Sequence, residues 1–171
     1  MIGENVFLSF EEKQKRTPKN NGYWTGERGN STFYSDNSKV KKLGCDCISY
    51  INGEPDFTTC SKFIFPIPSM TDDRLPYSKH FRSNYEQAYL KLSEELNMSE
   101  NDAKKWLKNN HYTIHESNDL STIYIVPTEI HKTYIHAGGV AECKSAMEDE
   151  EDDDLIEIVV HYLPGKSGFS G

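Results

Sequence analysis

Long apolar runs are absent from this 171-residue sequence. No stretch approaches the roughly 20 apolar residues that a helix needs to cross a bilayer, so no membrane-spanning helix and no membrane partner are expected. Residues 1–10 are too short and too acidic for a secretory signal peptide. We therefore expect a protein that acts in the cytoplasm, or that is secreted into a target cell by a route other than Sec.

Cysteine pairs with zinc-binding spacing are also missing. The four cysteines are Cys45, Cys47, Cys60 and Cys143. One residue separates Cys45 from Cys47, whereas zinc-binding pairs usually have two to four residues between them. Because cytosolic proteins rarely keep disulfides, we expect these cysteines to be reduced thiols.

The sequence also lacks an excess of positive charge, since its net charge is −8. Such an excess is common in nucleic-acid-binding proteins. Residues 148–154 are seven consecutive acids, and Glu157 makes eight. These eight match the whole net charge, so the rest of the chain is neutral and can carry a local basic face. Such a block is typical of a solvated tail or an interaction segment. Our hypothesis is that it competes with nucleic acid for the active face or binds a partner; the alternative is a solubilising spacer.

The clearest helical patterns lie in the middle of the chain. Apolar residues recur at three- and four-residue steps over residues 77–97, which predicts a helix. Ser99 has the position of an N-cap for a second helix, with Asp102 three residues further on. That helix is expected to end at Asn109 and Asn110. The sequence thus predicts a helical pair joined by a short turn.

The region before the helical pair is rich in turn signals. Residues 1–21 combine a short apolar start with a polar linker, and residues 22–31 contain three glycines. Cys47–Ile51 is a short strand-like run that ends at the turn signal Asn52-Gly53. We therefore expect an irregular, loop-rich N-terminal region within an α+β fold.

The segment after the helical pair has the pattern strand, turn, strand, helix. Residues 112–116 and 121–126 have strand character, and the Ser117-Asn118-Asp119 sequence between them predicts a turn. Thr128 can cap a short helix over residues 129–135, which Gly138 can close. The expected result is a β-hairpin followed at once by a helix.

Three of the six histidines lie in this segment. His115 is near the end of the first strand, with Glu116 beside it, while His131 and His136 are on or beside the helix. Side chains five apart on a regular helix differ by about 140°. His131 and His136 can therefore bind the same ion only if the helix is short or distorted, or if His136 lies beyond its end. Histidines clustered with a carboxylate indicate metal binding or catalysis.

The order of these motifs resembles the bacterial HNH/endonuclease VII superfamily of toxin nucleases. The family motif runs T-x-H-[H/E], then a valine-proline strand end followed by histidine, then H-x-G-G. The matching residues here are Thr113, His115, Glu116, Val126, Pro127, His131, His136, Gly138 and Gly139. The upstream strings GYWTGERGNS and YINGEPDF are also similar to segments that precede the motif, so the resemblance covers about residues 22–140.

This resemblance implies a His-Me finger, in which a β-hairpin and a helix hold a divalent metal ion such as Mg, Mn or Zn. It implies a metal-dependent endonuclease that hydrolyses phosphodiester bonds, with DNA favoured over RNA as the substrate. It also implies a toxin of interbacterial competition that a cognate immunity protein neutralises. The alternative is a non-catalytic, metal-stabilised binding or adaptor module of a toxin–immunity system.

The resemblance also implies roles for individual residues. His131 and His136 correspond to metal-side histidines. Glu116 stands where many relatives carry histidine, which leaves two assignments for the pair that it forms with His115. Either His115 is the base with Glu116 as a helper or ligand, or His115 is a ligand and Glu116 the base. We favour the first, because a glutamate with a pKa of roughly 4.3 is the poorer proton acceptor at neutral pH.

The domain organisation that follows has three parts. Residues 1–21 form an N-terminal segment, residues 22–143 the HNH-like nuclease toxin domain, and residues 144–171 an acidic C-terminal tail. Within the domain, Arg28 and Lys132 are candidate phosphate contacts, and for Arg28 the alternative is an ordinary surface ion pair.

Overall fold

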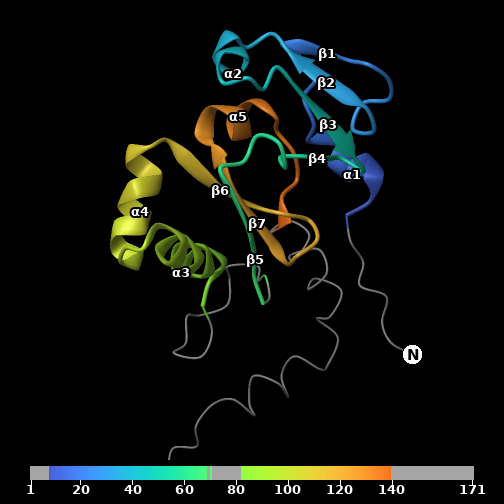
Figure 1. Cartoon of the computed structure of the whole chain (residues 1–171). Coiled ribbons are helices and arrows are strands. Elements are labelled where there is room, and N and C mark those ends of the chain that lie inside the picture. Colours follow the sequence, from blue (N-terminus) through green and yellow to red (C-terminus); the bar gives the residue numbers. More distant parts are fainter. Residues whose placement is uncertain (1–7, 69, 71–81, 140–171) are drawn as a thin grey trace, which may run out of the picture.

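The computed structural model describes residues 8–68, 70 and 82–139. These residues form two small antiparallel sheets and several helices (Figure 1). One sheet has the strand order β1-β2-β3-β4, and the other has the order β5-β7-β6. The expected α+β class is confirmed. The acidic residues 148–154 and Glu157 lie outside the described residues.

The first half of the chain builds the four-stranded sheet. Its elements are α1 (Phe10–Lys15), β1 (Gly22–Trp24), β2 (Thr32–Ser35), α2 (Ser38–Lys42), β3 (Cys47–Ile51) and β4 (Glu54–Pro55). The predicted turn joins β3 to β4, with positive φ at both Asn52 (51°) and Gly53 (78°). Asparagine and glycine tolerate that conformation, so this pair reverses the chain tightly.

Helix α1 lies where the sequence suggested a polar linker. Its start is a capping box, in which the Ser9 side chain accepts from the Glu12 N–H and the Glu12 carboxylate accepts from the Ser9 N–H. The Ser-x-x-Glu spacing was present in the sequence as a helix-start signal. Six residues are too few for a clear apolar period, which is why the helix was missed.

The second half of the chain builds the three-stranded sheet and the helices around it. Its elements are β5 (Phe63–Pro66), α3 (Asn84–Leu96), α4 (Glu100–Asn109), β6 (Tyr112–Glu116), β7 (Thr122–Pro127) and α5 (Thr128–Thr133). Helix α4 starts as predicted, with Ser99 accepting from the Asp102 N–H. Helix α3 starts at Asn84, later than predicted, because Ser83 and Glu86 form a capping box. Residues 77–81 lie outside the described residues.

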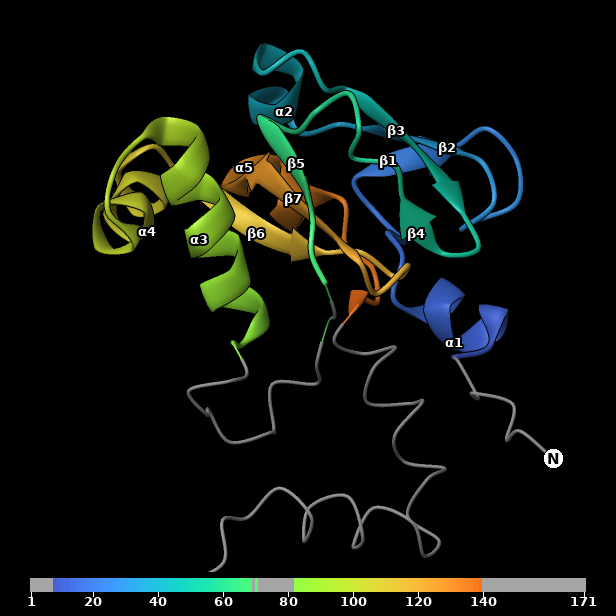
Figure 2. The same cartoon turned by 60° about the horizontal axis from the view of Figure 1, so that its bottom comes forward.

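Strand β7 contributes to two apolar cores. Ile123 and Ile125 pack with residues of α3 and α4, such as Leu92. Val126 packs instead with residues of the four-stranded sheet and α5, such as Tyr50. The turned view in Figure 2 shows α3 and α4 on one side of the three-stranded sheet and the four-stranded sheet on the other. The hairpin that carries the histidines is therefore held between the two halves of the fold.

Two of the cysteines are joined, contrary to expectation. Cys45 and Cys60 form a disulfide, while Cys47 is a free thiol. The β3–β4 turn returns the chain so that Cys60 packs against the core that contains Cys45. The prediction of reduced thiols was wrong for this pair because it rested on the expected compartment, and sequence spacing alone does not show this return. Cys143 lies outside the described residues.

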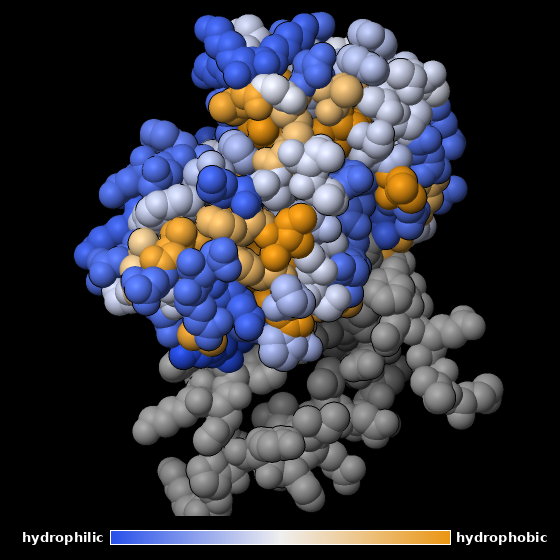
Figure 3. Space-filling view, viewed as in Figure 1, coloured by the Kyte–Doolittle hydropathy of each residue, from blue (hydrophilic) through white to orange (hydrophobic). Residues whose placement is uncertain are grey.

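The surface of the described part is of mixed polarity. Hydrophobic residues are exposed in small patches that hydrophilic residues surround (Figure 3). None of the helices described here has both the length and the apolar character that a membrane crossing requires.

Candidate metal centre

The histidine segment folds as strand, turn, strand and helix, as its sequence predicted. Strands β6 and β7 pair antiparallel, and α5 follows β7 without a linker. Thr128 is the first residue of α5 and not its cap, because Pro127 occupies the N-cap position; the Thr128 hydroxyl lies 2.8 Å from that of Thr113. The helix ends at Thr133, two residues earlier than expected. His131 is therefore inside the helix, whereas His136 lies beyond its end.

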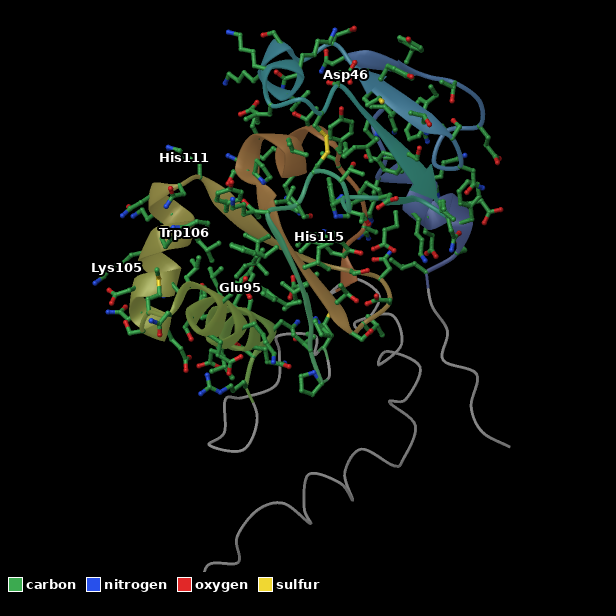
Figure 4. The ribbon with its side chains drawn as sticks, in the orientation of Figure 1. Asp46, Glu95, Lys105, Trp106, His111 and His115 are labelled. Atoms are coloured by element: carbon green, nitrogen blue, oxygen red, sulfur yellow. A yellow bond between two sulfur atoms is a disulfide. The ribbon has the colours of Figure 1, made fainter. Side chains whose placement is uncertain are left out.

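This short helix lets the three histidines converge. One ring nitrogen from each of His115, His131 and His136 lies within 4.8 Å of the other two. Nε2 of His136 is 3.0 Å from Nδ1 of His115. Two nitrogens that each bind one ion at roughly 2.05 Å in tetrahedral geometry are about 3.3 Å apart. The cluster is thus compact enough for one metal ion, and His115 lies in the interior of the fold (Figure 4).

The tautomer of His136 follows from its backbone contact. Its Nδ1 lies 2.8 Å from the carbonyl oxygen of Tyr134, which can only accept a hydrogen bond. In the neutral ring Nδ1 therefore carries the proton, and the lone pair of Nε2 faces His115. Tyr134 is itself anchored, because its buried hydroxyl donates to the carbonyl of Cys45 at 2.8 Å. The chain thus presents an unprotonated nitrogen to the cluster, as metal binding requires.

An aromatic ring covers the cluster. The Phe57 ring centroid lies 4.8 Å from that of His115, 5.9 Å from that of His131 and 5.6 Å from that of His136. Burial, together with the neighbouring His115, lowers the pKa of His131 to about 4 and that of His136 to about 3. Both side chains are therefore neutral at pH 7, the form that binds a metal.

A carboxylate from the other sheet stands behind His115. Oε1 of Glu54 is 3.8 Å from Nε2 of His115 and accepts from the Ser117 hydroxyl at 3.0 Å and the Asn118 N–H at 2.8 Å. If Nδ1 of His115 bound a metal, its proton would reside on Nε2, which faces this carboxylate. Carboxylates commonly orient metal-binding histidines in this way. Sequence reasoning missed Glu54 and Phe57 as individual residues; the signal was the YINGEPDF string that contains both.

Glu116 lies beside the cluster and not within it. Its Oε1 accepts from Nδ2 of Asn84, a buried residue of α3, at 2.7 Å. Adjacent residues of a strand point to opposite faces, so Glu116 and His115 diverge. The group of possible metal ligands contains the three histidines without Glu116. Glu116 still lines the cavity of about 620 Å³ into which the histidines open.

The two candidate phosphate contacts are placed differently. Lys132 is exposed on α5 and lines the histidine cavity. Arg28 is in the loop between β1 and β2 and is not among the residues that line this cavity. Arg16, which follows α1, does line it, although no sequence signal singled it out. Arg16 and Lys132 therefore place two cations at this cavity, beside the histidine cluster.

Comparison with known protein families gives a match. No curated protein matches the chain. Residues 47–138 match the family described as the DNase/tRNase domain of colicin-like bacteriocin, and this match covers more than half of the chain. It includes β3, the β6–β7 hairpin, α5 and all three clustered histidines. The chain therefore belongs to the family of DNase/tRNase domains of colicin-like bacteriocins, and it is a nuclease domain of the bacteriocin-toxin type.

Proposed function

We propose that this domain is a metal-dependent endonuclease of the His-Me finger type, formed by β6, β7 and α5. It hydrolyses phosphodiester bonds of nucleic acid, with DNA favoured over RNA. The observation that carries the proposal is the convergence of His115, His131 and His136 at an open cavity that also contains Arg16 and Lys132. Cations beside such a cavity suit a phosphate-bearing substrate.

The three histidines are suited to hold a divalent cation. Two of them are neutral at pH 7, and a set of three protein donors leaves a position open for a substrate or water. Imidazole ligands favour Zn²⁺, while Mn²⁺ and Mg²⁺ remain candidates. When bound, such an ion would neutralise charge on the phosphate and on the leaving oxygen. Arg16 and Lys132 would bind neighbouring phosphate oxygens.

The geometry supports His115 as a ligand and Glu116 as the base, which reverses our initial preference. His115 is 2% exposed, its Nδ1 faces His136, and Glu54 stands behind its other nitrogen. A base must reach a water molecule in the cavity. Glu116 is only partly buried and lines the cavity, and Asn84 holds its carboxylate. Glu116 would therefore take the proton from the attacking water.

Metal binding and cleavage, measured separately, test these roles. Zn²⁺ or Mn²⁺ binding is measured by calorimetry, and plasmid nicking is measured with each metal and with EDTA. We expect Glu116→Gln to bind metal like the wild type but to cleave about 10²- to 10⁴-fold more slowly. His115→Ala should lose both properties, while Lys41→Ala, an exposed residue of α2 that lines neither the histidine cavity nor the cluster, should keep both.

Other outcomes would contradict this assignment. Full metal binding by His115→Ala together with normal cleavage by Glu116→Gln would restore His115 as the base. A wild-type protein that nicks neither DNA nor RNA in any metal would favour the non-catalytic binding module.

The family also supports a biological context. A colicin-like nuclease domain acts in a target cell, so we propose a role in interbacterial competition with a cognate immunity protein as partner. Expression of the domain in a bacterial host offers a simple test. The wild-type domain should arrest growth of a bacterial host, and Glu116→Gln should not.

A further inference from the structure

A second groove adjoins the histidine cavity. Its volume is about 430 Å³, and it shares Tyr85, Thr113 and Ile114 with that cavity. It runs along β6, one of the two edge strands of its sheet, between that strand and the helices α3 and α4. His111, the residue before β6, and His115, one residue before the end of β6, are both labelled in Figure 4. A chain that lay in this groove would therefore lead directly to the metal centre.

The groove combines aromatic rings with positive charge. The rings of Tyr85 and Tyr89 are stacked with centroids 6.4 Å apart, and Tyr85 is 44% exposed. Nζ of Lys104 lies 5.8 Å from the ring centroid of Tyr89, and Lys108 is exposed beside it. His111 is also among the lining residues, and none of these is acidic. Aromatic rings that stack with bases, beside cations that bind the backbone, are typical of sites for unpaired nucleotides.

The opposite side of the histidine cavity has a different character. A third cavity of about 650 Å³ continues from it and shares Lys132 and Ile135. Lys15 and Lys19 line this side, and its one aromatic residue, Phe33, is buried. Lysines lie on both sides of the histidine cluster, but among the residues that line these two cavities an exposed aromatic ring, that of Tyr85, is present only on the α3–α4 side.

We propose that the groove along β6 binds unpaired nucleotides next to the scissile phosphate. A base stacks on the exposed ring of Tyr85, against which Tyr89 packs, and the phosphates pair with Lys104 and Lys108. The substrate is thus nucleic acid with a single-stranded or looped segment at the cleavage site, and a regular duplex is cleaved less well. This inference rests on the proposed nuclease function, for which it names the substrate class.

Binding without metal tests the groove independently of catalysis. The full chain is titrated in EDTA into a fluorescent single-stranded oligonucleotide and into the matching blunt duplex, with anisotropy as the readout. We expect tighter binding of the single strand. Tyr85→Ala should weaken that binding about fivefold or more, since base stacking on an aromatic ring is worth about 1–3 kcal/mol. Tyr85→Phe, which keeps the ring, should bind like the wild type.

Charge reversal on α4 provides a matched pair of variants. Lys104→Glu/Lys108→Glu should weaken single-strand binding more than tenfold at low salt. Lys105→Glu, on the same helix but outside the groove, should weaken it much less. Wild-type affinity in Tyr85→Ala, equal effects of the two sets of lysine variants, or equal affinity for single strand and duplex would each overturn the proposal.

A cleavage assay distinguishes failure of the groove proposal from failure of the proposed nuclease function. If the wild type cleaves nucleic acid with metal but Tyr85→Ala cleaves loops and duplexes in the wild-type ratio, the groove proposal fails while the nuclease function stands. If Tyr85 and the groove lysines bind single strands as expected but the wild type cleaves nothing, the groove proposal stands as a binding site and the nuclease function fails.

Discussion

Acid should destabilise the metal-free protein through its buried histidines. Their pKa values are about 4 for His131 and about 3 for His136, whereas an unfolded histidine has a pKa of about 6.5. The unfolded state therefore binds more protons below pH 6.5. The stability that the neutral rings contribute is complete above that pH and is lost as the pH falls toward 4 and then 3. At pH 5 the loss relative to pH 8 is about 2 kcal/mol for each ring, or about 4 kcal/mol together.

Urea unfolding at pH 8 and pH 5 measures this loss. The experiment is done with EDTA and without reductant, with the fluorescence of Trp24 and Trp106 as the signal. Other groups also titrate in this range, so the comparison is between variants. His131→Gln and His136→Gln should each lose about 2 kcal/mol less than the wild type between the two pH values. Asn109→Gln, an exposed change that removes no titrating group, should follow the wild type.

One result would refute the reasoning. If His131→Gln and His136→Gln lose as much stability as the wild type when the pH falls to 5, the two rings are not held neutral by burial. The low pKa values, and with them the idea of a site that is ready to bind metal at neutral pH, would then be wrong.

Three further predictions concern the metal, the disulfide and the acidic segment. Zn²⁺ at about 100 times its Kd should stabilise the wild type by about 2.7 kcal/mol in urea unfolding. His115→Ala should lose this stabilisation. Equal stabilisation of both proteins would contradict the assigned ligand set. Reduction of the Cys45–Cys60 disulfide, which spans 15 residues, should lower the free energy of unfolding by about 3 kcal/mol. Cys47→Ser should leave that difference unchanged, and equal stability with and without reductant would argue against a stabilising bridge. Truncation at Cys143 should raise affinity for DNA in an anisotropy titration; unchanged affinity would leave the acidic segment as a spacer.

Features with local causes could be read from the sequence. Ser99 caps α4 because its hydroxyl meets an N–H three residues away, and Asn52-Gly53 turns because both residues tolerate positive φ. The order strand, turn, strand and helix followed from apolar spacing and from Pro127. The missed helix α1 and the late start of α3 also had local signals, since each begins with Ser-x-x-Glu.

The sequence predicted the elements of the candidate site but not how their side chains meet. The sequence by itself determined the hairpin, the helix and three histidines at spacings that allowed a common centre. Tertiary structure decided that α5 stops at Thr133, so that His136 turns back toward His115. Tertiary structure also placed Glu54 and Phe57, from the four-stranded half of the fold, beside His115. It paired Glu116 with Asn84, away from the histidine cluster. Those contacts depend on how two apolar cores pack on either side of β7. No local pattern in the sequence encodes this packing, because it joins segments that are far apart in the chain.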